Sequence, residues 1–470
     1  MKPQRDLKHI FAPDSVAVIG ASREPHKLGH ILLKNILTGG YQGKIYPINP
    51  KIPEILGLKT CPTLANIEDE VELAIIATPA STVPDLMKQC VERKVKGAII
   101  ISGGFSEIGE EGKARQQEVV NIARQGNIPL LGPNCQGVSN PYANFCATWP
   151  VNVVKGNIAI ISQSGSVSAA FQCWAEQEQI GLSKLIDPGI RADIDEVEIL
   201  EYLANDPHTK VISIYTEGLL RAREFLNTAN KIAERKPILI LKGGRTARGA
   251  KAALSHTRSL AGRDEVYSGA FKQAGAMRTT TLEEFYDTSK AFSMLTIPER
   301  EQVLIVTTSG GLAILALDTC EDLGVPLTQI SDETKDQLKA TLSDVATVGN
   351  PLDLADRGLI AQPYLDVADA IATEEVGISL LIFGDPVEEA PKIASEFKTR
   401  TKTQVIVAYL GGGELELRDR TKIHKLGVPV YASPERAVTA ISNMLQFKFR
   451  RKKREAYFRE STVGTVQPAK

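Results

Sequence analysis

The sequence has few cysteines, almost no net charge and no long apolar run, and each of these features excludes some classes of protein. Six cysteines occur in 470 residues, none in a C-x-x-C pair, so neither a disulfide scaffold nor a metal site is expected. The 55 basic and 56 acidic residues nearly cancel, which argues against a nucleic-acid or anionic-membrane partner. No stretch reaches the ~18 uninterrupted apolar residues of a membrane span, and residues 1–8 lack a signal-peptide core. We therefore expect a cytoplasmic protein with reduced thiols.

The length and the strand pattern predict an α/β protein of three domains, because 470 residues are too many for one core. Short apolar runs end in small or turn-forming residues and lead into stretches of helical periodicity, which is typical of parallel sheets covered by helices. In the first block the expected strands lie at 16–19, 44–48, 73–77, 98–102 and 129–131. This pattern predicts a Rossmann-like domain at residues 1–150, with a crevice at the carboxyl ends of its strands.

Two later blocks open alike, which indicates an internal duplication. A predicted strand at 158–161 leads into a serine–glycine turn and a helix, and so does a predicted strand at 303–307. Further strands are expected at 211–215, 237–241, 378–383, 405–409 and 428–431. We interpret residues 151–297 and 298–470 as two flavodoxin-like domains.

The two serine–glycine turns are candidate anion sites. The first N–H groups of a helix have no intrahelical partner, and the helix dipole favours negative charge there. A single serine–glycine turn can serve equally well to reverse the chain direction or to bind a ligand. Two such turns in matching positions fit a different arrangement, in which one phosphate is held from opposite sides. The candidate residues are Ser164, Gly165, Ser166, Ser309, Gly310 and Gly311.

The turn of the first block departs from a dinucleotide fingerprint. Gly20-Ala21-Ser22 with Gly29 does not have the G-x-G-x-x-G spacing. Asn49-Pro50-Lys51 stands where an acidic residue would bind the ribose of NAD. A lysine there tolerates a phosphate, so CoA or NADP fits this turn better than NAD.

His256 is set apart from the other five histidines by its neighbourhood. It lies in a predicted loop of small, uncharged residues at 252–262, in which Arg258 carries the only charge. A neutral imidazole is a competent nucleophile near neutral pH, and a carboxylate on its other nitrogen would fix the tautomer. Glu217, after the predicted strand at 211–215, is a candidate for that carboxylate, although spacing alone favours an ordinary loop acid.

Together these residues resemble the α part of the ADP-forming acetyl-CoA synthetases, within the superfamily of succinyl-CoA synthetase and ATP-citrate lyase. The resemblance covers residues 11 to about 449. It is carried by Ser15-Val16-Ala17-Val18-Ile19-Gly20-Ala21-Ser22, Tyr46-Pro47-Ile48-Asn49-Pro50, Gly132-Pro133-Asn134-Cys135, Ser162-Gln163-Ser164-Gly165-Ser166, Ser255-His256-Thr257, Asn350-Pro351-Leu352-Asp353-Leu354 and Ser433-Pro434-Glu435-Arg436-Ala437.

The resemblance implies a Rossmann-like CoA-binding domain, two CoA-ligase domains, and an NDP-forming acyl-CoA synthetase that joins acetate or another short acid to CoA. By resemblance, His256 carries phosphate from ATP to the acid, Glu217 holds the imidazole, and the two serine–glycine turns bind the phosphate. The CoA thiol then attacks the acyl phosphate. The CoA contacts implied are Gly20, Ala21, Ser22, Asn49, Pro50 and Pro79.

The sequence contains no recognisable ATP-grasp domain, so the resemblance implies that ATP or ADP with Mg²⁺ binds to a separate β subunit of an α₂β₂ heterotetramer. Two places depart from the family: Arg258 replaces a usual glycine, and Asp187-Pro188-Gly189-Ile190 replaces a serine–asparagine turn. These departures keep a non-catalytic CoA-binding regulator open as an alternative. A nicotinamide-dependent oxidoreductase fits less well, because the ribose-binding acid is absent.

Overall fold

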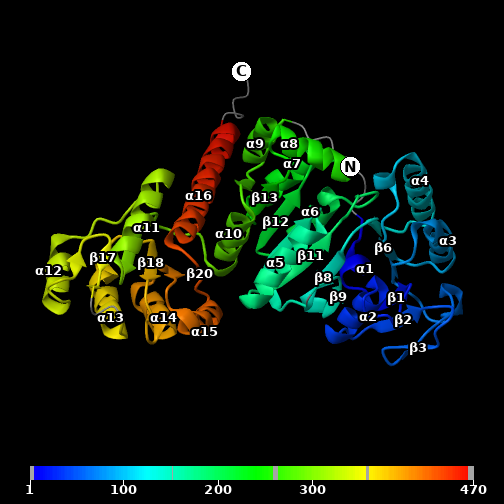
Figure 1. The fold of residues 1–470 in the computed structure, drawn as a ribbon. Coiled ribbons are helices and arrows are strands. Elements are labelled where there is room, and N and C mark those ends of the chain that lie inside the picture. The colour runs from blue at the N-terminus through cyan, green and yellow to red at the C-terminus, as the bar shows by residue number, and fades with distance from the viewer. Residues whose placement is uncertain (1–4, 151, 258–262, 356–358, 464–470) are drawn as a thin grey trace, which may run out of the picture. The chain divides into compact units, whose positions relative to one another are not determined.

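A computed structural model describes residues 5–150, 152–257, 263–355 and 359–463, without the side chains of 254–257 and 453–463. The chain divides into two compact units, Met1–Thr280 and Thr281–Lys470. In each unit strands and helices alternate along the chain (Figure 1). No helix in the described ranges is long and apolar enough to cross a membrane.

The first sheet of unit 1 is five-stranded and parallel, in the order β2-β1-β5-β6-β7. Its central strands are apolar and fully buried, as expected for a sheet covered on both faces. Its strands are β1 (Ser15–Ile19), β2 (Lys44–Ile48), β5 (Leu73–Ile76), β6 (Gly97–Ile100) and β7 (Leu130–Leu131), with the hairpin β3 (Glu54–Ile55) and β4 (Leu58–Lys59) beside it. Its helices are α1 (Lys8–Phe11), α2 (Leu28–Thr38), α3 (Val83–Glu92) and α4 (Glu110–Gln125).

The second sheet of unit 1 has seven strands in the order β14-β13-β12-β10-β11-β8-β9. Its strands are β8 (Gly137–Asn140), β9 (Phe145–Ala147), β10 (Lys155–Ser162), β11 (Leu182–Asp187), β12 (Val211–Thr216), β13 (Ile238–Lys242) and β14 (Met277–Thr279). Its helices are α5 (Gly165–Gln177), α6 (Glu196–Asn205), α7 (Ala222–Ile232), α8 (Ala247–Thr257) and α9 (Asp264–Gln273). The β8–β9 hairpin pairs antiparallel with β11, so chain that precedes residue 150 completes this sheet.

Unit 2 contains a six-stranded sheet in the order β16-β17-β15-β18-β19-β20. Its strands are β15 (Val303–Thr307), β16 (Thr347–Val348), β17 (Leu352–Asp353), β18 (Ile378–Phe383), β19 (Gln404–Tyr409) and β20 (Val430–Tyr431). Its helices are α10 (Leu282–Met294), α11 (Gly310–Leu323), α12 (Asp332–Thr341), α13 (Ala361–Ala370), α14 (Ala390–Thr401), α15 (Gly413–Lys425) and α16 (Pro434–Val463).

Helix α10 belongs to unit 2, although it precedes the boundary that the sequence suggested at residues 297–298. It packs along α16, where Asp287 accepts hydrogen bonds of 2.6 and 3.0 Å from the Arg436 guanidinium. Lys290, one turn on, is fully buried, donates to the Val430 carbonyl oxygen at 2.6 Å and lies 3.7 Å from Asp287. These charged residues attach α10 to unit 2 rather than to the seven-stranded sheet of unit 1.

We expect Asp287→Asn to lower the free energy of unfolding of unit 2 by about 3 kcal/mol, because the fully buried Lys290 and the partly buried Arg436 then lose the Asp287 carboxylate. Urea unfolding followed by circular dichroism measures this. The matched control is Asp336→Asn, whose ion pair with Lys339 is exposed on both sides and should change stability by less than about 0.5 kcal/mol. Equal effects of the two substitutions would show that the Asp287 cluster does not hold α10.

Candidate functional site

The turn between β10 and α5 is built by hydroxyl groups of two serines. Ser162, the last residue of β10, donates from Oγ to the Ser164 carbonyl oxygen at 2.8 Å and accepts from the Ser164 N–H at 3.2 Å. Ser164 is the N-cap of α5 and accepts the Val167 N–H at its own Oγ at 3.4 Å. The turn is therefore fixed, while the N–H groups at Gly165 and Ser166, in the first helical turn, have no intrahelical acceptor.

The turn between β15 and α11 in unit 2 repeats the two hydrogen bonds between the last strand residue and the N-cap residue, but the Ser309 side chain makes no cap bond like that of Ser164. Thr307 donates from Oγ1 to the Ser309 carbonyl oxygen at 3.1 Å and accepts from the Ser309 N–H at 2.9 Å. Ser309 is the N-cap of α11, and Gly310 and Gly311 open the helix. The predicted duplication thus extends to individual hydrogen bonds, and each unit presents a helix N-terminus suited to an anion.

Glu217 follows β12 and is 6% exposed. Its backbone N–H donates to Gln163 Oε1 at 2.8 Å, and its Oε1 accepts from the Tyr215 hydroxyl at 3.3 Å. Burial and the adjacent Glu217 charge raise the pKa of Tyr215 to about 12, so this phenol remains a hydrogen-bond donor at neutral pH. Glu217 therefore keeps a fixed position at the carboxyl end of the second sheet.

Gln163 links Glu217 to a wider buried network. Its Nε2 donates to Thr216 Oγ1 at 3.0 Å, to the Gly218 carbonyl oxygen at 3.1 Å and to the Glu196 carboxylate. Arg191 donates from Nη1 to Glu196 Oε1 at 2.9 Å and to the Gly218 carbonyl oxygen at 2.7 Å. These bonds hold the loop after β12 from both sides, and they join it to the turn that precedes α5.

His256 lies in the last turn of α8, so the loop predicted for it is wrong for residues 252–257: their backbone is helical. The helix follows β13 and the Gly243-Gly244 turn, and this turn passes beside Glu217. A Cβ atom added at Gly243 would lie 2.7 Å from the Tyr215 hydroxyl and 3.5 Å from Glu217 Cγ. The side chain of His256 and all of Arg258 lie outside the described residues.

The first sheet carries a cavity of about 320 Å³ at the carboxyl ends of β1, β2 and β5. Four of the predicted CoA contacts line it, namely Gly20, Asn49, Pro50 and Pro79. The remaining walls are mostly apolar, with a few hydroxyl and amide groups: Ile19, Ile48, Pro62, Thr63, Leu64, Thr78, Thr82, Leu86 and Gln89. A flat heterocycle such as adenine suits walls of this kind.

The structure explains why Gly20 and Asn49 stand at their positions in this cavity. Gly20 has φ of +92°, and a Cβ atom there would lie 2.7 Å from the Ala77 carbonyl oxygen, so the chain can turn here only with glycine. Asn49 donates from Nδ2 to the Ala21 carbonyl oxygen at 2.8 Å and accepts from the Lys51 N–H at 2.9 Å. Asn49 thereby joins the turn after β1 to the turn after β2.

Ala21 and Ser22 are buried and lie next to the cavity rather than among its lining residues. The Ser22 carbonyl oxygen is hydrogen-bonded to His30 Nδ1 at 2.9 Å, which ties the turn to α2. Their predicted contact with CoA would therefore be made through the backbone of the turn.

We expect Asn49→Ala to weaken CoA binding at least about tenfold, since two turns of the cavity lose the side chain that joins them. Isothermal titration of the full chain with CoA measures the change. Asn121→Ala serves as the control, because Asn121 is exposed on α4 and accepts a hydrogen bond of 2.8 Å from Gln117, one turn away on the same helix. If the Asn49 variant bound CoA with wild-type affinity, this cavity would not be part of the CoA-binding site.

Two polar residues that the sequence analysis did not select lie beside the α5 N-terminus. A Cβ atom added at Gly165 would lie 3.5 Å from Gln136 Oε1 and 3.7 Å from Asp187 Oδ2, with no closer neighbour. Asp187 is 3% exposed, and burial raises its pKa to about 7, although the N–H groups of Gly189 and Gln136 donate to its carboxylate. The sequence had marked residues 187–190 only as a departure from the resembling family.

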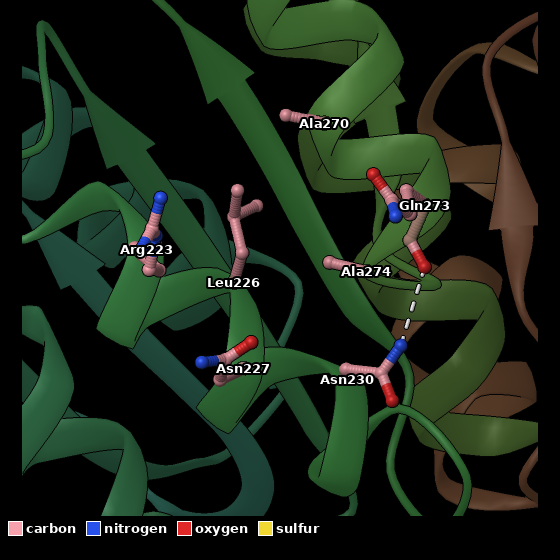
Figure 2. A pocket seen from close by; sticks show the side chains of 7 residues that line it. All are labelled: Arg223, Leu226, Asn227, Asn230, Ala270, Gln273 and Ala274. Atoms are coloured by element: carbon pink, nitrogen blue, oxygen red, sulfur yellow. Dashed lines mark hydrogen bonds between the residues drawn. The ribbon is translucent and has the colours of Figure 1, made fainter.

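A second hollow lies between α7 and α9 (Figure 2). Its volume is about 420 Å³, and Asn230 closes one end by donating from Nδ2 to the Gln273 carbonyl oxygen at 3.2 Å. It is lined by Arg223, Leu226, Asn227, Asn230, Ala270, Gln273 and Ala274. This lining offers no carboxylate, histidine or cysteine, so the hollow has no group for acid–base or nucleophilic chemistry. Within the described ranges no cluster of histidine, cysteine and carboxylate side chains is arranged to hold a metal ion.

Two family models match the chain. Residues 14–141 match a CoA binding domain, and residues 155–292 match a succinyl-CoA ligase like flavodoxin domain. The matches agree with the predicted fold class, which is confirmed: a Rossmann-like first sheet followed by a flavodoxin-like sheet.

Curated relatives match over nearly the whole chain. Subunit alpha of the ADP-forming acetate–CoA ligase I of Pyrococcus furiosus is 38% identical over 465 residues, 96% of this chain and 99% of the relative. The ADP-forming acetate–CoA ligase of Methanocaldococcus jannaschii is also 38% identical over 96% of this chain, which spans only 64% of that relative's length.

A solved structure with the same fold is the dinucleotide forming acetyl-coenzyme A synthetase 1 of Ca. Korarchaeum cryptofilum, in complex with phosphate and ADP. It is 34% identical, covers 95% of this chain and 98% of its own, and has a TM-score of 0.87.

Proposed function

Since the chain belongs to the family of ADP-forming acetate–CoA ligase α subunits, we propose that it joins acetate or another short carboxylic acid to CoA with His256 as the phosphate carrier. It is an acid–thiol ligase of the NDP-forming kind. The observation that carries the proposal is the nearly end-to-end match to an α subunit, with a serine–glycine turn in each unit.

The proposed reaction has three transfers. An imidazole nitrogen of His256 attacks the γ-phosphorus of ATP and ADP leaves. A carboxylate oxygen of the acid then attacks the phosphohistidine, which frees the imidazole and gives an acyl phosphate. The CoA thiolate finally attacks the acyl carbon and inorganic phosphate leaves, so ATP, acid and CoA give ADP, phosphate and acyl-CoA. Each transfer is reversible, and the reverse sequence makes ATP.

We assign two supporting roles to the chain's own residues. Glu217 accepts a hydrogen bond from the imidazole nitrogen that does not carry phosphate, and so stabilises the phosphorylated ring. Ser164, Gly165 and Ser166 at α5, and Ser309, Gly310 and Gly311 at α11, bind phosphate through backbone N–H groups. The position of Glu217 at the carboxyl end of β12, next to the turn that leads to α8, supports the first role.

The CoA cavity fits its proposed ligand. The apolar walls at Ile48, Leu64 and Leu86 would cover the adenine, while Gly20 and Asn49 bring backbone groups close to the diphosphate. The narrow turn at Gly20 permits that approach because it has no side chain.

We further propose that a separate ATP-grasp β subunit binds ATP with Mg²⁺, in an α₂β₂ assembly in the cytoplasm. The lengths support this: the chain spans 99% of a relative named as an α subunit, but 64% of a relative named as the ligase without a subunit. Magnesium would neutralise the charge of the transferred phosphate there.

Mixing the purified chain with an ATP-grasp chain of the same organism, ATP, acetate and CoA tests the proposal. When both chains are present, acetyl-CoA and ADP should form in equal amounts. Neither product should form when either chain is left out. If the pair binds CoA but forms no acyl-CoA from acetate or from other short acids, the chain is instead a CoA-binding regulator.

A further inference from the structure

The side chain of Gln136 contains a buried hydrogen-bond acceptor that nothing in the described part of the chain satisfies. Gln136 is 2% exposed, and its Nε2 donates to the Trp149 carbonyl oxygen. Its Oε1 is buried and accepts no hydrogen bond from any described residue. Because Nε2 is committed to a carbonyl oxygen, the amide cannot be reversed, and Oε1 must face the α5 N-terminus.

A second acceptor lies beside the same helix N-terminus. A Cβ atom added at Gly165 would lie 3.7 Å from Asp187 Oδ2 and 3.5 Å from Gln136 Oε1, so both oxygens border the same space. Each Asp187 oxygen accepts one backbone N–H, from Gly189 at Oδ1 and from Gln136 at Oδ2, and keeps a second lone pair. The space beside Gly165 is therefore bounded by two acceptors.

Unit 2 has a carboxylate in the matching position. A Cβ atom added at Gly310, the first residue of α11, would lie 3.1 Å from Asp353 Oδ2, and Asp353 Oδ1 accepts the Ala355 N–H at 3.0 Å. A helix N-terminus with a carboxylate oxygen beside its first glycine thus occurs in both units. Only unit 1 adds the unsatisfied amide oxygen of Gln136 to it.

A ligand that gives hydrogen-bond partners both to the free N–H groups of α5 and to Gln136 Oε1 must carry acceptors and a donor on one small group. Its acceptors face the N–H groups of the first turn of α5, and its donor faces Gln136 Oε1 and Asp187. Hydrogen phosphate has three oxygens that accept and one P–OH group that donates. Sulfate has the same shape but no O–H at neutral pH, so it would leave Gln136 Oε1 without a donor and add no hydrogen bond to Asp187.

We propose that Gln136 Oε1 and the Asp187 carboxyl group accept the hydrogen bond of the P–OH group of hydrogen phosphate at the α5 N-terminus, and so select phosphate over sulfate. The inference rests on the proposed function, which places phosphate at this turn. It adds two specificity-determining residues to the site. It also gives the inorganic phosphate of the reaction a mode of recognition that depends on its proton.

Isothermal titration of the full wild-type chain with inorganic phosphate and with sulfate at pH 8 tests the proposal. Phosphate should bind at least about tenfold more tightly than sulfate, because sulfate leaves the buried Gln136 Oε1 unpaired and places no O–H between itself and the Asp187 carboxylate. This comparison needs no variant. Equal affinity for the two anions would overturn the inference.

Three variants separate the inference from the site on which it rests. Gln136→Met keeps the size of the side chain without Oε1 and should reduce the preference for phosphate to about threefold or less. Thr148→Val is the matched control, since Thr148 also donates to the Trp149 carbonyl oxygen, at 3.4 Å, and it should keep the wild-type preference. Gly165→Ala meets no neighbour closer than 3.5 Å, so it should fold, fill the space and bind neither anion.

The outcomes fall into distinct classes. A full phosphate preference in folded Gln136→Met, with binding still lost in Gly165→Ala, overturns the roles of Gln136 and leaves the proposed phosphate site intact. Phosphate binding that survives in Gly165→Ala, or is absent from the wild type, overturns both the inference and the placement of phosphate at α5.

Discussion

Replacing His256 with asparagine is expected to lower the rate of acetyl-CoA synthesis by at least about a thousandfold, because the amide nitrogen of asparagine is not nucleophilic and cannot carry phosphate. The measurement is the steady-state rate of the chain mixed with its ATP-grasp partner. Binding of CoA should be unchanged, since the cavity at Gly20 and Asn49 lies on the first sheet and His256 on a helix of the second.

His208→Asn is the control for the His256 variant. His208 is exposed and stacks on the Tyr142 ring at 3.6 Å, so its loss should leave the rate within about twofold of wild type. A His256 variant that retains more than a tenth of the wild-type rate would mean that phosphate is carried elsewhere.

The second large effect is expected for Glu217→Gln, which should lower the turnover number at least about a hundredfold with little change in KM for CoA. A neutral amide cannot stabilise the positive charge that develops on the imidazole when it is phosphorylated. The substitution leaves the backbone N–H of residue 217 bonded to Gln163, so the loop after β12 should keep its position. Turnover and KM measured in the same titration separate this effect from a loss of fold.

Glu176→Gln provides the comparison for Glu217→Gln, because Glu176 is an exposed acid on α5, the helix whose N-terminus lies near the site. It should be active at the wild-type level. If the Glu217 variant is as active as the Glu176 variant, Glu217 is an ordinary structural acid and the imidazole is held by another group.

Much of the fold could be predicted because its strands are short apolar runs that end in turn-forming residues. Strands β2, β15 and β18 have the predicted bounds, and the other predicted strands differ by a few residues at the ends. The short strands β3, β4, β14, β16 and β17 were not predicted. The β8–β9 hairpin was missed, since Gly137, Ser139 and Asn140 make β8 look polar although all four of its residues are buried. Its pairing with β11 is a long-range contact that no local pattern contains.

Helix α10 shows a second limit of local patterns. Its amphipathic sequence predicts a helix but does not say which sheet it will pack on. That choice depends on Asp287, Lys290 and Arg436, which meet only when residues 149 positions apart in the chain fold together. The sequence therefore suggested a boundary near residue 297, whereas the compact units divide at Thr280.

The candidate site was predictable where a turn has a local signature. The serine–glycine turns at α5 and α11 were selected from their sequence, and their matching hydrogen bonds involve residues only two apart. Gln136 and Asp187 were not selected, because one lies on the β7–β8 connection and the other ends β11. They are 51 positions apart and become neighbours of Gly165 only through the pairing of β8 with β11.

The central claim is that the chain carries the phosphoryl group on His256, and mapping the phosphorylated residue tests it most directly. The chain is mixed with its ATP-grasp partner and γ-labelled ATP without acid or CoA, then digested and sequenced by mass spectrometry under alkaline conditions that preserve phosphohistidine. The account predicts one labelled peptide, with phosphate on His256 and release of the label when acetate and CoA are added. Label on any other residue, or label on His256 that acetate and CoA do not release, would contradict it.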